Sequence, residues 1–142
     1  MDQETLALSD MHDCIEACRS CHDTCLAMAM NHCLELGGKH VAPEHFKLMM
    51  NCAEICQTSL NFMLSDSTLR HSVCAVCAEV CEACALSCER VGQMNECIKA
   101  CNLCAEKCRQ MAGNQMDLHM HGNSQYQQPT TGVSGGMPRQ GI

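Results

Sequence analysis

The apolar positions of this chain recur every three or four residues along most of its length. Between Cys74 and Cys88, five cysteines follow one another at intervals of three, four, three and four residues, with alanines in several gaps. An α-helix turns by about 100° per residue, so this spacing keeps all five thiols within one narrow stripe. Nothing in the stretch breaks a helix. The pattern therefore predicts a helix that presents sulfur, in place of the usual leucine, to a shared interior.

Similar stripes recur elsewhere, and they predict four helices. Gly37 and Gly38 are expected to end the first helix and Gly92 the third. Pro43 suits the first position of the second helix. The first helix should start between residues 3 and 10. The four expected helices end near residues 36, 64, 91 and 112.

Helices of about 20 to 30 residues joined by short turns imply antiparallel neighbours. We therefore expect an all-α fold, an antiparallel up-down four-helix bundle with a Cys-lined core, over residues 5–112. From residue 113 the sequence consists largely of Gly, Gln, Ser, Thr and Pro with little apolar content. This composition predicts a disordered C-terminal tail over residues 113–142.

The composition indicates a core built largely from sulfur-containing side chains. The 142 residues include 16 Cys and 12 Met but no Trp, one Tyr and two Phe. Cys is smaller than Leu by about two methylenes, and each buried methylene contributes about 0.8 kcal/mol. A core that served only stability would not lose this much at nearly every seam position. The alternative, that each Cys is merely a small buried apolar residue, does not account for the repeated spacing.

Cysteine at this density is also typical of secreted disulfide scaffolds. Residues 1–6 lack the basic start and apolar run of a signal peptide. Thiols three or four residues apart in a helix project in parallel, which suits a bridging metal better than an S–S bond. We expect free thiols in a reducing, cytoplasmic location. The net charge of −7 argues against nucleic acid and anionic membranes as partners, and no apolar run approaches the length of a membrane span.

Soft thiolates select Cu(I), Zn(II) or iron–sulfur clusters. The number of sulfurs far exceeds what one or two structural zinc ions require. Cu(I) accepts two or three sulfurs, so a ladder of thiolates can hold a chain of ions. Burying the charge favours about one monovalent ion per thiolate, or about 15 per chain, which indicates storage. The candidate ligands are Cys14, Cys18, Cys21, Cys25, Cys33, Cys52, Cys56, Cys74, Cys77, Cys81, Cys84, Cys88, Cys97, Cys101, Cys104 and Cys108.

The cysteine ladders of residues 14–33, 52–56, 74–88 and 97–108 resemble the bacterial copper storage proteins of the cytosolic branch. The resemblance covers roughly residues 5–112. It implies a homotetramer of bundles, each filled with Cu(I) bound mainly by Cys thiolates, and no catalysis.

The resemblance also implies that copper enters where the first helix finishes and the fourth begins. The soft or imidazole side chains expected there as transient Cu(I) contacts are Met28, His32, His45, Met49 and Met94, of which we add His45, Met49 and Met94 to the candidate ligands.

The pattern also places several other side chains. In a regular helix, Cys33 leaves its seam by roughly 80–100°, so we expect it at the edge of the interior or facing a neighbouring chain. His40 is expected on the surface. The side chains at the opposite end of the bundle, expected mostly to form a hydrophobic plug, are Met11, Met63, His71 and Met111. The apolar residues expected to pack between helices are Leu26, Leu34, Ile55, Leu60, Val73, Val76, Val80, Leu86, Ile98 and Leu103. The tail adds a small donor cluster of Met116, His119, Met120 and His121.

Three alternatives stay open from the residues. A zinc or cadmium buffer of the metallothionein type is the nearest, because softness alone does not exclude those ions. A copper-responsive regulator would need fewer sulfurs and a basic face. A redox enzyme could use C-x2-C pairs or an iron–sulfur cluster, but these pairs lack the strand-to-helix setting that lowers a thiol pKa.

Overall fold

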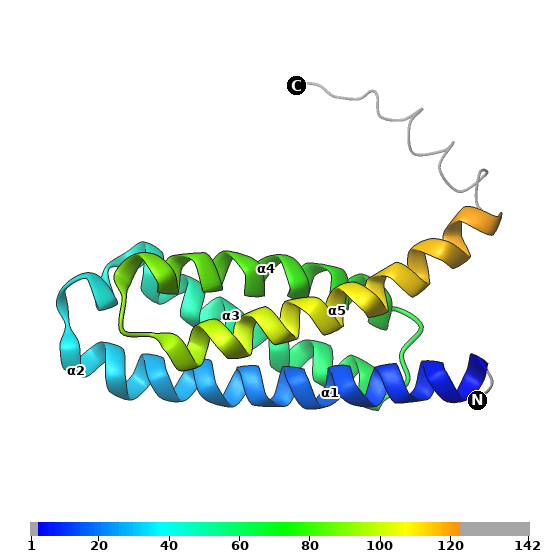
Figure 1. The fold of residues 1–142 in the computed structure, drawn as a ribbon, viewed down its shortest axis with the longest axis horizontal. Helices are drawn as coiled ribbons and strands as arrows, with labels where there is room; N and C mark the ends of the chain where they lie inside the picture. The colour runs from blue at the N-terminus through cyan, green and yellow to red at the C-terminus, as the bar shows by residue number, and fades with distance from the viewer. Residues whose placement is uncertain (1–2, 123–142) are drawn as a thin grey trace, which may run out of the picture.

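The structure is a computed structural model that describes residues 3–122, with side-chain burial from residue 8 to residue 113. Within these residues it contains helices and no strand, which confirms the all-α fold. Four long rods lie side by side, and each contacts two others (Figure 1). The elements are α1 (Gln3–Ala27), the π-helix η1 (Met28–Cys33), α2 (Leu34–Leu36), the 3₁₀-helix η2 (Gly38–Val41), α3 (Pro43–Leu64), α4 (Arg70–Val91) and α5 (Asn95–Gly122).

The predicted helix breaks lie where the backbone turns into the left-handed region. Gly37 has φ 65° and Gly92 has φ 81°, conformations that glycine adopts without steric cost. Pro43 stands at the start of α3, where its missing N–H has no helical partner to lose. Short turns at these points make successive long helices antiparallel, so the predicted up-down bundle is confirmed.

The first rod contains a π-helix that the sequence pattern did not predict. Eight residues separate Cys25 from Cys33, which in a regular α-helix leaves Cys33 about 80° from the seam. The i→i+5 turn of η1 takes up the extra residue, and Cys33 is fully buried. The same shift turns His32 away from the axis, and its Nε2 lies 2.8 Å from the carbonyl oxygen of Gln93. His32, which was expected among the transient Cu(I) contacts, therefore lies outside the seam.

The last helix is longer than predicted. Gly113 does not end α5, which continues to Gly122. A single glycine costs a helix about 1 kcal/mol, and the residues that follow it up to His121 include no proline. The expectation of disorder from residue 113 is thus wrong for residues 113–122. For residues 123–142, which lie outside the described part of the chain, it stays a prediction.

Some apolar residues that were expected between helices face outward instead. Leu60 is buried, and Leu26 and Val80 pack against the core. In contrast, four side chains are about half exposed, because each lies one or two positions from a seam cysteine and is rotated by 100° or more from it. These outward residues are Leu34, Val76, Leu86 and Leu103.

One helix meets the length and composition of a membrane span, contrary to the expectation from the sequence. Within the described residues, α4 alone does so, with a mean hydropathy of 1.4 over an 18-residue window. Much of this hydropathy comes from Cys and Ala. Half of the window is buried inside the bundle, and buried core helices commonly meet the same criterion.

Candidate metal centre

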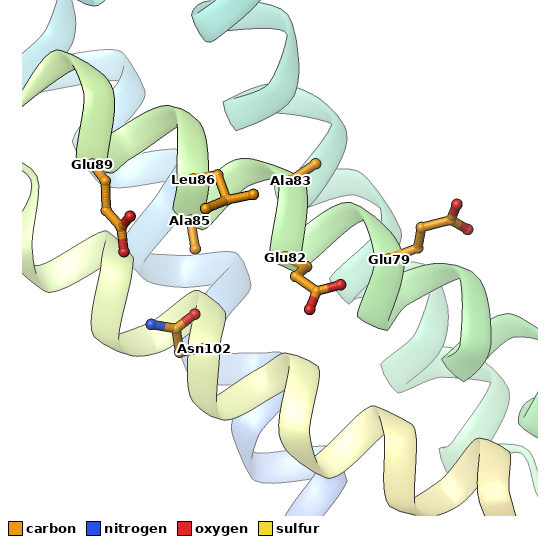
Figure 2. A pocket seen from close by; sticks show the side chains of 7 residues that line it. All are labelled: Glu79, Glu82, Ala83, Ala85, Leu86, Glu89 and Asn102. Carbon is orange, nitrogen blue, oxygen red and sulfur yellow. The ribbon is translucent and has the colours of Figure 1, made fainter.

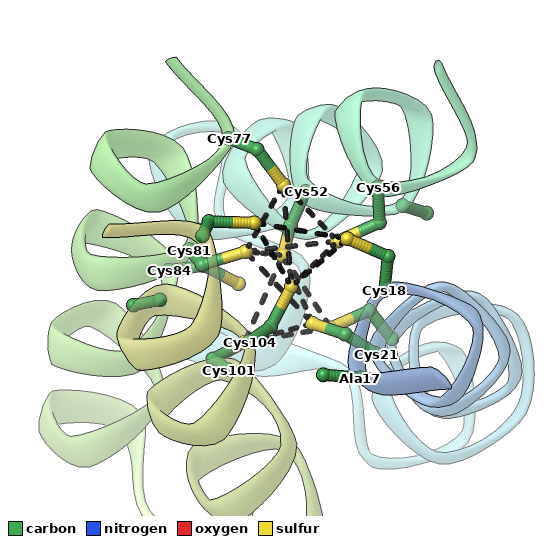
Figure 3. Packing of buried hydrophobic residues seen from close by; sticks show 14 of the residues in the cluster. Ala17, Cys18, Cys21, Cys52, Cys56, Cys77, Cys81, Cys84, Cys101 and Cys104 are labelled. Atoms are coloured by element: carbon green, nitrogen blue, oxygen red, sulfur yellow. Dashed lines mark hydrogen bonds between the residues drawn. The ribbon is translucent and has the colours of Figure 1, made fainter. Parts of the chain in front are cut away.

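The seams of the four long rods converge on one axis, which is lined with sulfur. All sixteen cysteines are free thiols, and each is fully buried. Figure 3 shows labelled thiols from α1, α3, α4 and α5 pointing toward one another in the middle of the bundle. The spacing of three and four residues produces this arrangement, because it returns each thiol to the inner side of its helix.

Neighbouring sulfur atoms lie at distances suited to a shared metal. The Sγ of Cys21 lies 3.6 Å from that of Cys52, 3.8 Å from that of Cys101 and 3.9 Å from that of Cys25. Metal–sulfur bonds of about 2.3 Å would separate three planar sulfurs by about 4.0 Å and four tetrahedral sulfurs by about 3.8 Å. The distances therefore fit three- or four-coordinate thiolate sites.

The sulfur sets share members, so they form a continuous ladder. Cys21 and Cys104 each belong to two sets of four, and Cys108 joins a set of four to a set of three. Within each set the sulfurs lie within 4.8 Å of one another. The sets are Cys21/Cys25/Cys52/Cys101, Cys21/Cys56/Cys81/Cys104, Cys18/Cys77/Cys104/Cys108 and Cys14/Cys74/Cys108.

Hydrogen bonds between thiols move their pKa values in both directions. The thiol of Cys101, whose Sγ lies 3.6 Å from that of Cys25, lowers the pKa of Cys25 to about 2. Cys104 likewise lowers the pKa of Cys18. Hydrogen bonds with Cys21 and Cys25 raise the pKa of Cys101. The thiols thus share protons along the ladder, and a metal ion that binds there displaces those protons.

Thioether sulfur completes the ladder at the end where η1 meets the start of α5. The Sδ of Met49 lies 3.6 Å from the Sγ atoms of both Cys84 and Cys88. Near it, the Sδ of Met94 lies 3.9 Å from the Sγ of Cys33. Both methionines are fully buried. They lie where the sequence placed them.

His45 joins this end of the ladder. Its Nε2 lies 3.8 Å from the Sγ of Cys33, and its Nδ1 lies 2.8 Å from the hydroxyl oxygen of Ser87. Burial lowers the pKa of His45, so the imidazole is neutral and can offer a lone pair. Ser87 was not singled out from the sequence. The available signal was a small polar residue next to a seam cysteine.

His40 lies beside His45, and His32 lies beside His40. The ring centroid of His40 lies 5.7 Å from that of His32 and 6.3 Å from that of His45. The expectation that His40 is a surface residue is wrong, because it is buried and its Nε2 lies 3.0 Å from the carbonyl oxygen of Gly92. Together with the contact of His32 to Gln93, this bond ties the α4–α5 turn to η1 and η2.

A comparison of the sequence with known protein families agrees with this arrangement of sulfur. The sequence model of the family described as copper storage protein matches residues 3–113. The chain belongs to the copper storage protein family. The resemblance seen in the cysteine ladders is therefore confirmed.

Solved structures of similar chains agree with the copper storage fold. The Nmul_A1745 protein from Nitrosospira multiformis is 62% identical, with a TM-score of 0.73 over 74% of this chain and 96% of that one. The Cu(I)-bound copper storage protein BsCsp3 is 37% identical, with a TM-score of 0.68 over 72% of this chain and 98% of that one. The apo form of copper storage protein 3 from Bacillus subtilis is 39% identical, with a TM-score of 0.58 over 70% and 95%.

A curated relative is also similar. The cysteine-rich protein YhjQ from Bacillus subtilis, described as uncharacterized, is 39% identical over 71 residues, which cover 47% of this chain. The match spans about three fifths of that relative (61%).

The opposite end of this copper storage bundle is closed by few sulfur donors. Ser59 takes the place of a thiol on α3, and its hydroxyl oxygen lies 3.3 Å from the Sγ of Cys74. Met63 and Met111 are buried beyond it. The Nδ1 of His71 lies 2.7 Å from the carbonyl oxygen of Met111. These contacts agree with a plug at this end. The predicted donor cluster of residues 116–121 lies outside the part of the chain whose side chains are described.

A surface pocket between α4 and α5 has different chemistry. Figure 2 shows Glu79, Glu82 and Glu89 beside Leu86 and Asn102 around a volume of about 410 Å³. All five side chains are exposed, and they offer oxygen or carbon rather than sulfur. Cu(I) prefers soft donors, so this pocket lies apart from the metal ladder both in place and in chemistry.

Proposed function

We propose that the chain stores and buffers Cu(I), bound by the thiolates of all sixteen cysteines, with Met49, Met94 and His45 as additional ligands at one end. The observation that carries this proposal is the continuous ladder, in which sets of three and four thiols share members. Shared sulfurs allow bridging, so adjacent ions need no separate sites. About one ion per thiolate leaves the buried interior neutral.

The same charge argument separates Cu(I) from the zinc or cadmium alternative. A divalent ion bound by four thiolates carries two excess negative charges, and such charge is costly to bury. One monovalent ion per thiolate carries none. The similar protein BsCsp3, whose structure was solved with Cu(I) bound, supports the same choice.

We also propose that the protein is cytoplasmic, forms a homotetramer and has no catalytic role. Free thiols at this density are stable in a reducing compartment. The outward side chains of Val76, Leu86 and Leu103 offer apolar surface for contacts between copies. All sixteen thiols are fully buried, so none is open to a substrate from solvent, which favours storage over catalysis.

An anaerobic titration tests the storage proposal. The reduced protein is titrated with Cu(I) in the presence of a chromogenic chelator, and we expect about 15 equivalents to bind before the chelator competes. Saturation after one or two equivalents would overturn storage. A parallel titration with Zn(II), followed by Cu(I), should show the zinc displaced. Light scattering of the protein as it leaves a size-exclusion column gives the number of chains per particle, and we expect four.

A further inference from the structure

A second cavity lies beside the end of the ladder that contains His45. It has a volume of about 480 Å³ and lies between η2, the start of α3 and the end of α4. Two basic side chains, Lys39 and Arg90, line it together with Glu44. His45 and Ser87 also line it. The cavity therefore reaches two side chains that are already part of the metal end.

The basic side chains of this cavity are unusual for so acidic a chain. The net charge is −7. Within the described residues the basic side chains that form salt bridges are Arg19, His22, Arg70 and Arg109, so neither Lys39 nor Arg90 is paired there. Glu44 lies in the first turn of α3, where the helix dipole offsets part of its charge. The cavity thus offers two free cations to a ligand.

A short path of soft donors leads from the cavity to the ladder. His45 is 3% exposed, and its hydrogen bond to Ser87 fixes the ring. This orientation places Nε2 of His45 3.8 Å from the Sγ of Cys33, which in turn lies 3.9 Å from the Sδ of Met94. His45 lines the cavity, and a copper ion bound by its Nε2 would lie close to the Sγ of Cys33.

We propose that this cavity docks an anionic Cu(I) complex of a small carboxylate-bearing thiol and passes its copper through His45 to Cys33. The inference rests on the proposed storage function and names the donor. Cu(I) is held by soft thiolates, so a small thiol is a suitable carrier in a reducing compartment. Carboxylates on that thiol make the complex anionic and complementary to Lys39 and Arg90. The cavity volume lies within the range of about 300–1,000 Å³ that is typical of small-molecule sites.

The transfer is a ligand exchange without redox change. The Cu–S bond to the carrier breaks as a Cu–S bond to Cys33 forms, with Nε2 of His45 as a transient ligand. The proton of the Cys33 thiol moves to the released carrier thiolate, so charge and atoms balance. Copper stays Cu(I) throughout. The empty carrier leaves as a neutral thiol with its carboxylates.

Loading rates with two copper donors test this proposal. The full chain is loaded anaerobically from Cu(I)–glutathione, an anionic thiol complex, and from Cu(I)–acetonitrile, a cationic complex. The variant Lys39→Gln/Arg90→Gln should load about tenfold more slowly from glutathione, since electrostatic steering changes association rates by about 10- to 1,000-fold. Its loading from acetonitrile should be unchanged or faster, because the substitutions remove repulsion toward a cationic complex. Lys47→Gln/Lys99→Gln is the matched control, because it removes two exposed cations outside the cavity.

Three outcomes would overturn the proposal. The cavity variant could load from Cu(I)–glutathione at the normal rate, its loading from both copper donors could slow equally, or loading of the control variant could slow as much. A second measurement needs no variant. Higher salt should slow loading of the unmodified protein from glutathione, whereas repulsion by the net charge of −7 alone would make salt accelerate it. The final copper count tests storage separately. If the cavity variant binds the normal number of Cu(I) ions and loads at an unaltered rate, only the docking site is overturned and the storage function stands.

Discussion

Met49 shows how a single residue defines the end of the metal ladder. It lies on α3 at a position that the three-and-four spacing places in the seam, three residues before Cys52. Its Sδ lies 3.6 Å from the Sγ atoms of both Cys84 and Cys88. A thioether is a soft ligand without charge, so it can bind Cu(I) but does not balance the charge of the ion. Copper is therefore expected to be held less tightly here than between thiolates.

Replacing Met49 with leucine tests its role as a ligand. The two side chains have similar volume, so the fold should lose less than about 1.5 kcal/mol of stability. We expect about one of the bound Cu(I) ions to be lost to a chromogenic chelator at a lower chelator concentration than in the unmodified protein. Met63→Leu is the matched control, because Met63 is equally buried and lies at the opposite end of the bundle. Equal copper counts for both variants at every chelator concentration would remove Met49 from the ligand set.

At the scale of the element, the π-helix η1 decides which side chains face the axis. A regular helix would leave Cys33 about 80° from the seam. The wider turn brings Cys33 inside and leaves His32 beside the α4–α5 turn. The wider turn of η1 therefore accommodates one residue more than the seam spacing of a regular helix allows, and the helix on either side stays regular.

Changes in length within η1 test this interpretation. Deleting Met30, which is 40% exposed, should convert η1 to a regular helix and keep Cys33 seven residues from Cys25, still in the seam. Inserting one alanine after Met30 should instead rotate Cys33 outward. In the metal-free protein, we expect slow reaction of Cys33 with a thiol reagent in the deletion variant and fast reaction in the insertion variant. The fast phase should disappear when Cys33 is also replaced by alanine. Fast reaction in the deletion variant would contradict the proposed role of η1.

The differences between the predictions from the sequence and the structure also arise at the scale of the element. The three-and-four spacing predicted the four long helices, because fully buried seam positions leave a clear periodic pattern. The same pattern could not reveal η1, since a π-turn depends on what the neighbouring helices bury rather than on local spacing. The burial of His40 depends on a contact with Gly92, 52 positions away in the sequence. The continuation of α5 past Gly113 shows that one glycine is a weak stop.

At the scale of the whole molecule, the metal-free interior is a packed core. The thiols that keep their protons behave as small apolar side chains, and sulfur–sulfur contacts of 3.6–4.0 Å satisfy their weak hydrogen bonds. Met63 and Met111 add bulk at one end, and Met49 and Met94 at the other. We therefore expect the fold not to depend on metal, in contrast to small zinc domains that unfold without their ion.

Removal of copper tests that conclusion. The far-ultraviolet circular dichroism of the reduced, metal-free protein should match that of the loaded protein, because the helices are present before binding. Loading should raise the melting temperature by at least about 10 °C, since ligands that bind only the folded state stabilise it and this chain offers many sites. A variant with the three thiols Cys14, Cys74 and Cys108 replaced by alanine should melt below the unmodified protein when empty, because three buried sulfur atoms are lost, and should gain less on loading. Collapse of the helical signal after copper is stripped under reducing conditions would mean that metal, rather than packing, holds the four helices together.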